Sequence, residues 1–150
     1  QYIKEVCENG GDILEIGFGM GICSNFIQEH NIKSHTIIEI HDEVFEKLIE
    51  WAKDKPNVIP IKGDWLGSIP NKKYDGIMYD TWKDNRTNQF KKLISQHTKT
   101  GTIFTFYNSY QKESNGFNYK ATYTILDVEP DLQNKKYFTD KKYYLPKVIF

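Results

Sequence analysis

The sequence has few cysteines, no excess of either charge and no long apolar run, and each absence excludes a class of protein. Its two cysteines, Cys7 and Cys23, lack the spacing of a metal site or a disulfide framework, and two isolated thiols indicate a reducing cytoplasm. The net charge is zero, so no basic excess exists to neutralise phosphates, and we predict neither a nucleic-acid partner nor binding to anionic membranes. No apolar stretch approaches the roughly 18 residues of a membrane span.

What the sequence does contain is enough for one domain. Of its 150 residues, 39% are hydrophobic and 15% are aromatic, which is sufficient for a single core. We therefore expect residues 1–150 to form a single domain. Because the chain opens at Gln1 rather than at Met, a truncated N-terminus stays open as an alternative.

A glycine-rich stretch near the N-terminus organises the rest of the chain. Residues 13–16 are largely apolar and predict a short buried strand, Gly17, Gly19 and Gly21 follow at alternate positions, and residues 20–30 predict a helix. Glycine tolerates the positive φ of a tight turn and lets the backbone approach a ligand, so this layout is typical of nucleotide-like ligand sites. The spacing differs from the dinucleotide fingerprint G-x-G-x-x-G, because the third glycine comes one residue early. The alternative is a glycine-rich turn without a ligand.

Two glutamates stand at the ends of the first two expected strands. Glu15 precedes Gly17 by two residues, and a carboxylate buried there needs donors such as loop N–H groups or the ammonium of a ligand. Glu39 comes about 24 residues later, where a carboxylate can accept hydrogen bonds from both hydroxyls of a ribose. His41 either flanks an adenine ring or is a surface histidine at a helix start. The pair of glutamates favours an adenosine-containing ligand.

The pattern of strands and helices predicts an α/β fold. Five apolar strands alternate with amphipathic helices, which favours a mainly parallel sheet with helices on both faces. Two further strands are joined by a segment too polar for a packed helix, so we expect them to form an antiparallel hairpin. The expected strands are 13–16, 34–40, 58–61, 75–79, 102–107, 119–128 and 143–150, and the expected helices are 20–30, 42–53, 65–69 and 86–97, with Asp42 as a helix cap.

Polar residues also follow the third and fourth strands. Asp64 can accept a hydrogen bond from an adenine amine and Trp65 can offer a ring face, but a helix cap and a core tryptophan explain them equally well. Asp80 follows the fourth strand, at the sheet edge where open α/β folds place reactive groups. A carboxylate at this position implies a cationic acceptor, which it can bind and deprotonate. The alternative for Asp80 is a loop or cap residue.

These motifs together resemble a known family. The pattern Glu15-x-Gly17-x-Gly19-x-Gly21 and the terminal hairpin resemble class I S-adenosylmethionine-dependent methyltransferases. Gly17-Phe18-Gly19-Met20, the stretch 58–65 and Tyr79-Asp80-Thr81 are similar to guanidinoacetate N-methyltransferases and to the fungal arginine N-methyltransferases. The resemblance implies a Rossmann-like fold and S-adenosyl-L-methionine as cofactor, with no metal.

The resemblance also implies a role for particular residues. Asp80 would bind the guanidino group and act as the base. Cys23, from its position one turn into the helix after the glycine loop rather than from the resemblance, is expected to be a packing residue and not a nucleophile. The implied cofactor contacts are Glu15, Gly17, Phe18, Gly19, Met20, Gly21, Glu39, Ile40, Gly63, Asp64, Trp65, Tyr79 and Asp80. The implied substrate contacts are Asp80, Thr81, Trp82, Asn108, Ser109 and Tyr110.

The resulting hypothesis is an S-adenosylmethionine-dependent N-methyltransferase that acts on a small guanidino or amino compound, similar to guanidinoacetate. Three departures from the family are visible. Its second substrate carboxylate and aromatic lid lie N-terminal to the position of Tyr2, Trp82 replaces a tyrosine, and the segment after Asn108 is much shorter than the family's helix. A protein arginine methyltransferase and an inactive cofactor-binding module are the alternatives. The sequence does not distinguish a monomer from a homodimer.

Overall fold

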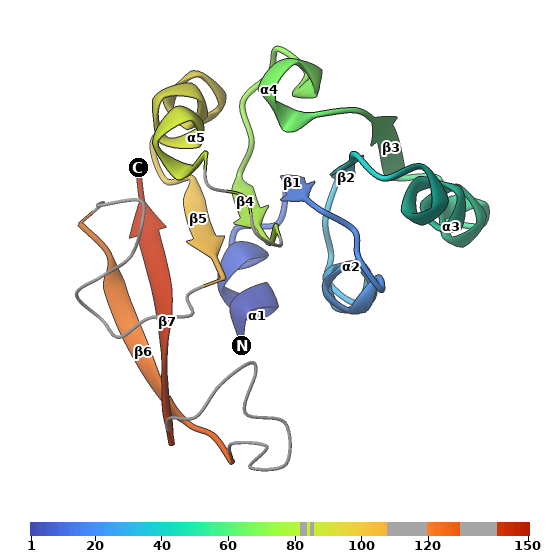
Figure 1. The fold of residues 1–150 in the computed structure, drawn as a ribbon. Helices are drawn as coiled ribbons and strands as arrows, with labels where there is room; N and C mark the ends of the chain where they lie inside the picture. Colours follow the sequence, from blue (N-terminus) through green and yellow to red (C-terminus); the bar gives the residue numbers. More distant parts are fainter. Residues whose placement is uncertain (82–83, 85, 108–119, 130–140) are drawn as a thin grey trace.

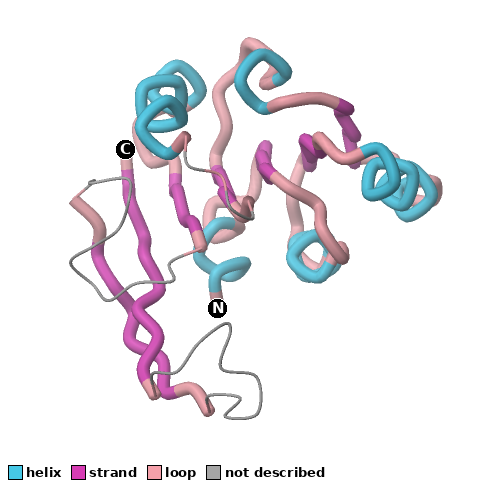
Figure 2. Tube along the Cα trace, viewed as in Figure 1, coloured by secondary structure: helices cyan, strands magenta, loops and turns pink. Residues whose placement is uncertain are grey.

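A computed structural model describes residues 1–81, 84, 86–107, 120–129 and 141–150. Among these residues, seven strands form one sheet in the order β3-β2-β1-β4-β5-β7-β6 (Figures 1 and 2). The first five strands along the chain are parallel, whereas β7 is antiparallel to both β5 and β6. The mainly parallel sheet and the terminal hairpin are therefore confirmed. The strands are β1 (Asp12–Ile16), β2 (Ser34–Glu39), β3 (Val58–Lys62), β4 (Gly76–Tyr79), β5 (Ile103–Phe106), β6 (Thr122–Asp127) and β7 (Lys142–Ile149).

Helices cover both faces of the parallel strands, which explains why these strands are apolar on both sides. Ile13 and Met78 belong to a core cluster with side chains of α1 and α2, while a second cluster joins β2 and β3 to α3. On the opposite face, Leu14 and Ile77 pack with side chains of α4 and α5 (Figure 1). The helices are α1 (Tyr2–Val6), α2 (Ile22–Gln28), α3 (Asp42–Ala52), α4 (Trp65–Ser68) and α5 (Thr87–Ile94), followed by a 3₁₀ turn, η1 (Ser95–His97). None of the helices in the described ranges has the length and apolar character needed to cross a membrane.

The start of α3 differs from the prediction that Asp42 caps this helix. Asp42 is the first helical residue, and His41 precedes it in an extended conformation. The N–H of His41 donates to Glu39 Oε1 at 2.8 Å, and this bond holds the chain extended until the helix begins. Asp42 instead pairs with Lys62 Nζ at 2.8 Å. The cap prediction was wrong because Glu39 fixes the entry into the helix.

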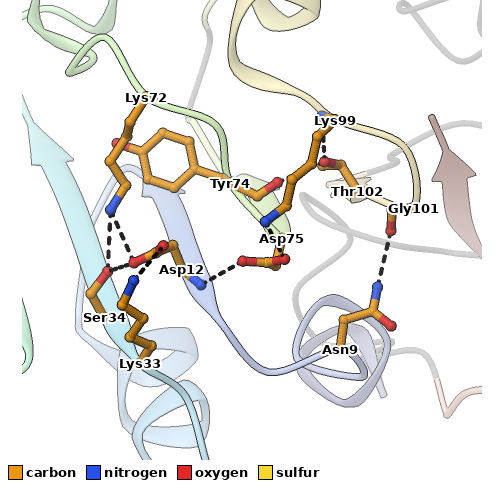
Figure 3. A network of polar contacts seen from close by, with 10 residues as sticks. All are labelled: Asn9, Asp12, Lys33, Ser34, Lys72, Tyr74, Asp75, Lys99, Gly101 and Thr102. Carbon is orange, nitrogen blue, oxygen red and sulfur yellow. Dashed lines mark hydrogen bonds and ion pairs between the residues drawn. The ribbon is translucent and has the colours of Figure 1, made fainter.

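A polar network joins the N-terminal ends of the strands, at the edge opposite to their carboxyl ends (Figure 3). Asp75 Oδ2 accepts from the N–H of Asp12 at 2.8 Å, and its Oδ1 pairs with Lys99 Nζ at 2.6 Å. Asp12 in turn binds the hydroxyl of Ser34 and Lys72 Nζ. These contacts connect β1, β2 and β4 at one end and leave their carboxyl ends to shape a site.

Candidate functional site

A cavity of about 500 Å³ opens at the carboxyl ends of β1, β2, β3 and β4. This is the edge at which open α/β sheets bind ligands, and β1 is the strand from which the chain order runs in both directions. The lining residues are Ile16, Gly17, Gly19, Ile38, Glu39, Ile40, His41, Val44, Gly63, Asp64, Trp65, Asp80, Thr81, Asp84 and Arg86. The structure thus brings together predicted residues from four separate strand ends.

The glycine turn lies directly against the residue proposed as the base. Gly17 has φ of +90°, and a Cβ atom built on it would lie 2.5 Å from the carbonyl oxygen of Asp80. On the neighbouring strand, the N–H of Asp80 donates to the carbonyl of Ile16 at 3.1 Å. Only glycine fits this close approach of β1 to β4, because any other side chain would push the two backbones apart.

Glu39 is fixed between the glycine turn and α3. Its Oε2 accepts from the N–H of Phe18 at 2.9 Å, and its Oε1 accepts from the N–H of His41 at 2.8 Å. The side chain is buried yet lines the cavity. A carboxylate oxygen can accept more than one hydrogen bond, so both oxygens keep capacity for the hydroxyls of a ribose. The residue fits the predicted adenosine-containing ligand.

Glu15 lies deeper, beneath the glycine turn, and only 1% of its surface is exposed. Its Oε2 accepts from Ser24 Oγ at 2.6 Å and lies 2.9 Å from Nε2 of the fully buried His35, although that contact is not aligned as a hydrogen bond. Its Oε1 has no hydrogen-bond partner among the residues described. The sequence suggested loop N–H donors, but the loop N–H of Phe18 serves Glu39 instead. Glu15 is not among the lining residues of the cavity above, so its contact with a ligand ammonium stays a prediction.

Among the residues described, Asp80 makes few contacts, and the pKa of its carboxyl group is raised. Asp80 is exposed as a residue and lines both cavities, while its carboxyl group is partly buried by neighbouring protein atoms. This burial raises the pKa of Asp80, and the nearby charge of Glu15 raises it further. A weak hydrogen bond from Cys23 Sγ, 3.7 Å from Oδ2, acts in the opposite direction. The proton affinity of this carboxylate is therefore increased, and the described residues use little of its hydrogen-bond acceptor capacity.

Asp84, four residues along the same connection, is held in the opposite way. Burial opposes its ionisation, but hydrogen bonds from Arg86, Trp65 and Tyr79 lower its pKa to about 2. Trp65 Nε1 donates to Oδ2 at 2.7 Å and the Tyr79 hydroxyl donates to it at 3.0 Å. Neither Asp84 nor Arg86 was among the predicted site residues. The signal that could have found Arg86 is that it is the single arginine among 20 lysine and arginine residues.

Asp64 and Trp65 make the contacts that their structural alternatives predict, a helix cap for Asp64 and a core position for Trp65. Asp64 Oδ1 accepts from the N–H of Leu66 at 2.9 Å and so caps α4. The Trp65 ring is buried, with ring centroids 5.2 Å from Phe90 and 6.2 Å from Tyr79. Both residues nevertheless line the cavity, so contact with a cofactor stays a prediction.

The remaining predicted residues occupy several positions. A second cavity of about 150 Å³ adjoins Asp80. Phe18, Met20, Ile22 and Cys23 are among the residues that line it. Gly21 precedes the first residue of α2. Ile40, Gly63 and Thr81 line the larger cavity, and Tyr79 is buried beside it. Trp82, Asn108, Ser109 and Tyr110 lie outside the residues that the structure describes.

Comparisons with known proteins agree with this architecture. The family model described as guanidinoacetate N-methyltransferase matches residues 2–125. Protein arginine N-methyltransferase 2 of Candida glabrata is 32% identical over 168 aligned positions, covering 92% of this chain and 40% of the relative. The chain therefore spans about 40% of the length of that relative.

Solved structures share the fold at low sequence identity. The N-methyltransferase NodS from Bradyrhizobium japonicum superposes with a TM-score of 0.71 at 14% identity, over 98% of this chain and 90% of that one. The same protein in complex with S-adenosyl-L-homocysteine gives a TM-score of 0.58 at 18% identity, over 71% and 57% of the two chains. Because the family model covers most of the sequence, the chain belongs to the guanidinoacetate N-methyltransferase family of class I methyltransferases, whose cofactor is S-adenosyl-L-methionine.

Proposed function

We propose that this chain is an N-methyltransferase for a guanidino group and that Asp80 is its base. The observation that carries the proposal is the contrast between two aspartates of one connection. Asp84 accepts hydrogen bonds from three side chains and its pKa is low. Asp80 lines both cavities, only the Cys23 thiol donates to its side chain among the described residues, and its pKa is raised. Carboxylates with raised pKa values in a cavity are candidates for general bases.

We further propose which residues hold the cofactor. Glu39 accepts from the ribose hydroxyls, Asp64 accepts from the adenine amine, and the turn at Gly17 and Gly19 lies against the methionine part. When bound, S-adenosyl-L-methionine supplies an electrophilic methyl group on a sulfonium. Glu15 adds negative charge beneath the turn, which suits a cationic ligand.

Asp80 then acts on the acceptor. A guanidinium has a pKa above about 12, so its nitrogen must lose a proton to accept a methyl group. The Asp80 carboxylate pairs with the guanidinium, orients one nitrogen and takes up the proton from that nitrogen. The raised pKa of Asp80 favours this transfer, because a stronger base accepts the proton more readily. Positioning of the acceptor accounts for the rest of the rate enhancement.

Two acceptors fit this chemistry. The family model points to guanidinoacetate or a similar small compound, and the curated relatives carry the name protein arginine N-methyltransferase 2. Thr81, Trp82, Asn108, Ser109 and Tyr110 are the proposed acceptor contacts. We place the chain in the cytoplasm as a single domain. An inactive cofactor-binding module is the alternative, and it would bind cofactor without forming a product.

The test is calorimetric titration of S-adenosyl-L-homocysteine, alone and with guanidinoacetate or an arginine peptide, followed by a turnover assay with each acceptor. Coupled binding and product from one acceptor are expected. Asp80→Asn should lower kcat by about a hundredfold or more while cofactor affinity changes by less than about threefold. Asp54→Asn, at an exposed position two residues after the end of α3, is the matched control. Full turnover by Asp80→Asn at saturating cofactor would contradict the proposal.

A further inference from the structure

We infer that Arg86 is a positioning residue that sets cofactor affinity and purine specificity by holding Asp64 at the cavity. The inference rests on the proposed role of Asp64 toward the adenine amine. Arg86 lines the cavity and connects two segments that belong to different strand ends, the β3–α4 connection and the β4–α5 connection. We call Asp64, Arg86 and Asp84 the carboxylate bracket.

The planar guanidinium of Arg86 donates hydrogen bonds to both carboxylates of the carboxylate bracket. Its Nε donates to Asp84 Oδ1 at 2.9 Å and its Nη2 donates to Asp84 Oδ2 at 3.1 Å, which is a bidentate pair. Its Nη1 donates to Asp64 Oδ2 at 2.6 Å. The guanidinium carbon also lies 4.8 Å from the centroid of the Trp65 ring. One side chain therefore connects both carboxylates and an aromatic face, so its orientation is fixed on three sides.

The bracket is anchored in the core at one end. Only 10% of the Asp84 side chain is exposed, and its Oδ2 also accepts from the buried Trp65 and Tyr79. Asp64, at the other end, is 41% exposed and would be mobile if it were held by its cap contact alone. Because Arg86 binds both carboxylates, the well-packed Asp84 restrains the orientation of Asp64 at the cavity surface.

Asp64 keeps the capacity to bind a ligand inside the bracket. Each carboxylate oxygen offers about two acceptor positions. Among the residues that the structure describes, Leu66 N–H occupies one position on Oδ1 and Arg86 occupies one on Oδ2. The remaining positions can accept from an amine donor. An acceptor placed opposite them would be repelled, so a correctly oriented Asp64 distinguishes an adenine from a hypoxanthine.

A lysine cannot reproduce this arrangement. Arg86 is the single arginine of the chain, and every other cationic side chain of the Lys/Arg type is a lysine. A lysine ammonium is a compact charge without a planar fork, so it can pair with Asp84 or with Asp64 but does not fix the angle between them. Arg86→Lys therefore keeps the charge and removes the geometry.

The experiment measures the affinity of S-adenosyl-L-homocysteine and of its inosine analogue, S-inosyl-L-homocysteine, by calorimetry. We expect Arg86→Lys and Arg86→Gln to weaken the first ligand by about tenfold and to reduce the preference for adenine over hypoxanthine by a similar factor. Lys53→Gln removes a cation from an exposed pair with Glu50 and should change neither value. Asp64→Asn, which keeps an oxygen to cap α4, should lose the same preference.

Unchanged affinity and unchanged base preference in folded Arg86 variants would overturn the inference. A lowered melting temperature with unchanged ligand binding would also overturn the inference, because Arg86 would then contribute to the stability of the fold and not to cofactor binding. Methyl transfer to Arg86 itself, seen by intact mass in the presence of the cofactor, would also overturn it. The measurement needs no acceptor, so failure of methyl transfer with normal cofactor binding would contradict only the proposed function.

Discussion

Comparing alanine substitutions at Gly19 and Gly101 distinguishes two effects: backbone strain at a glycine with positive φ, and steric contact between an added methyl group and the cofactor. Gly19 has φ of +55°, and a Cβ atom built there would meet no protein atom within 4 Å. The residue lines both cavities, so the added methyl group would enter the space proposed for the cofactor. Gly101, before β5, offers a matched control, because it has φ of +88° and equal free space but lies outside both cavities.

The two variants should lose similar stability. A non-glycine residue in the left-handed region costs about 1–2 kcal/mol. For a chain of this size, each kcal/mol corresponds to a fall in melting temperature of about 2–4 °C, so we expect a fall of about 2–8 °C for either alanine. Cofactor affinity should differ, because only Gly19→Ala places a methyl group against the ligand. Overpacking by one methyl group costs about 1–3 kcal/mol, which weakens binding by a factor of about five to somewhat over a hundred.

The assays are thermal unfolding without ligand and calorimetric titration of S-adenosyl-L-homocysteine at a temperature where both variants are folded. Equal stability loss with weakened binding in Gly19→Ala alone is the expected result. Wild-type affinity in Gly19→Ala would refute the placement of the cofactor beside the turn. Equal weakening in Gly101→Ala would show that backbone strain, rather than contact with the ligand, controls affinity.

Two further predictions concern the aspartates of the β4–α5 connection. Because the hydrogen bond from the thiol of Cys23 lowers the pKa of Asp80, Cys23→Ala should shift the acid limb of the kcat/KM profile to higher pH. An unmoved limb would show that the thiol does not act on Asp80. The pKa of Asp84 is about 2 in the folded chain and about 3.9 when unfolded, so its stabilising contribution is full above about pH 4 and is lost as the pH falls towards 2. Asp84→Asn should lower the free energy of unfolding by about 2 kcal/mol at pH 7. It should also reduce the dependence of this free energy on pH between about pH 4 and pH 2. An unchanged dependence would mean that other carboxylates cause it.

The sequence alone predicted most of the fold because the relevant signals are local. Alternating apolar strands and amphipathic helices required a parallel sheet covered on both faces, and the polar segment before residue 143 required a hairpin. The glycine spacing placed the turn, since the backbone approach at Gly17 depends on the absence of a side chain. In a parallel sheet the carboxyl ends of strands share one edge, so Glu39, Asp64 and Asp80 were expected to lie near one cavity, and all three line it.

Which partner each polar group binds was decided only by the tertiary structure. Glu15 accepts from Ser24 and lies 2.9 Å from His35 of the neighbouring strand, and Arg86 donates to Asp64 beside the cavity. Such contacts join residues that are distant along the chain, and their geometry depends on how helices and loops pack, which no local pattern encodes. The same reason explains why Trp65 lies in the core and why Asp80 and Asp84, alike in sequence, have opposite electrostatic environments. The sequence determined which groups could meet at the cavity, and packing decided which of them are neutralised by partners and which remain available for a ligand.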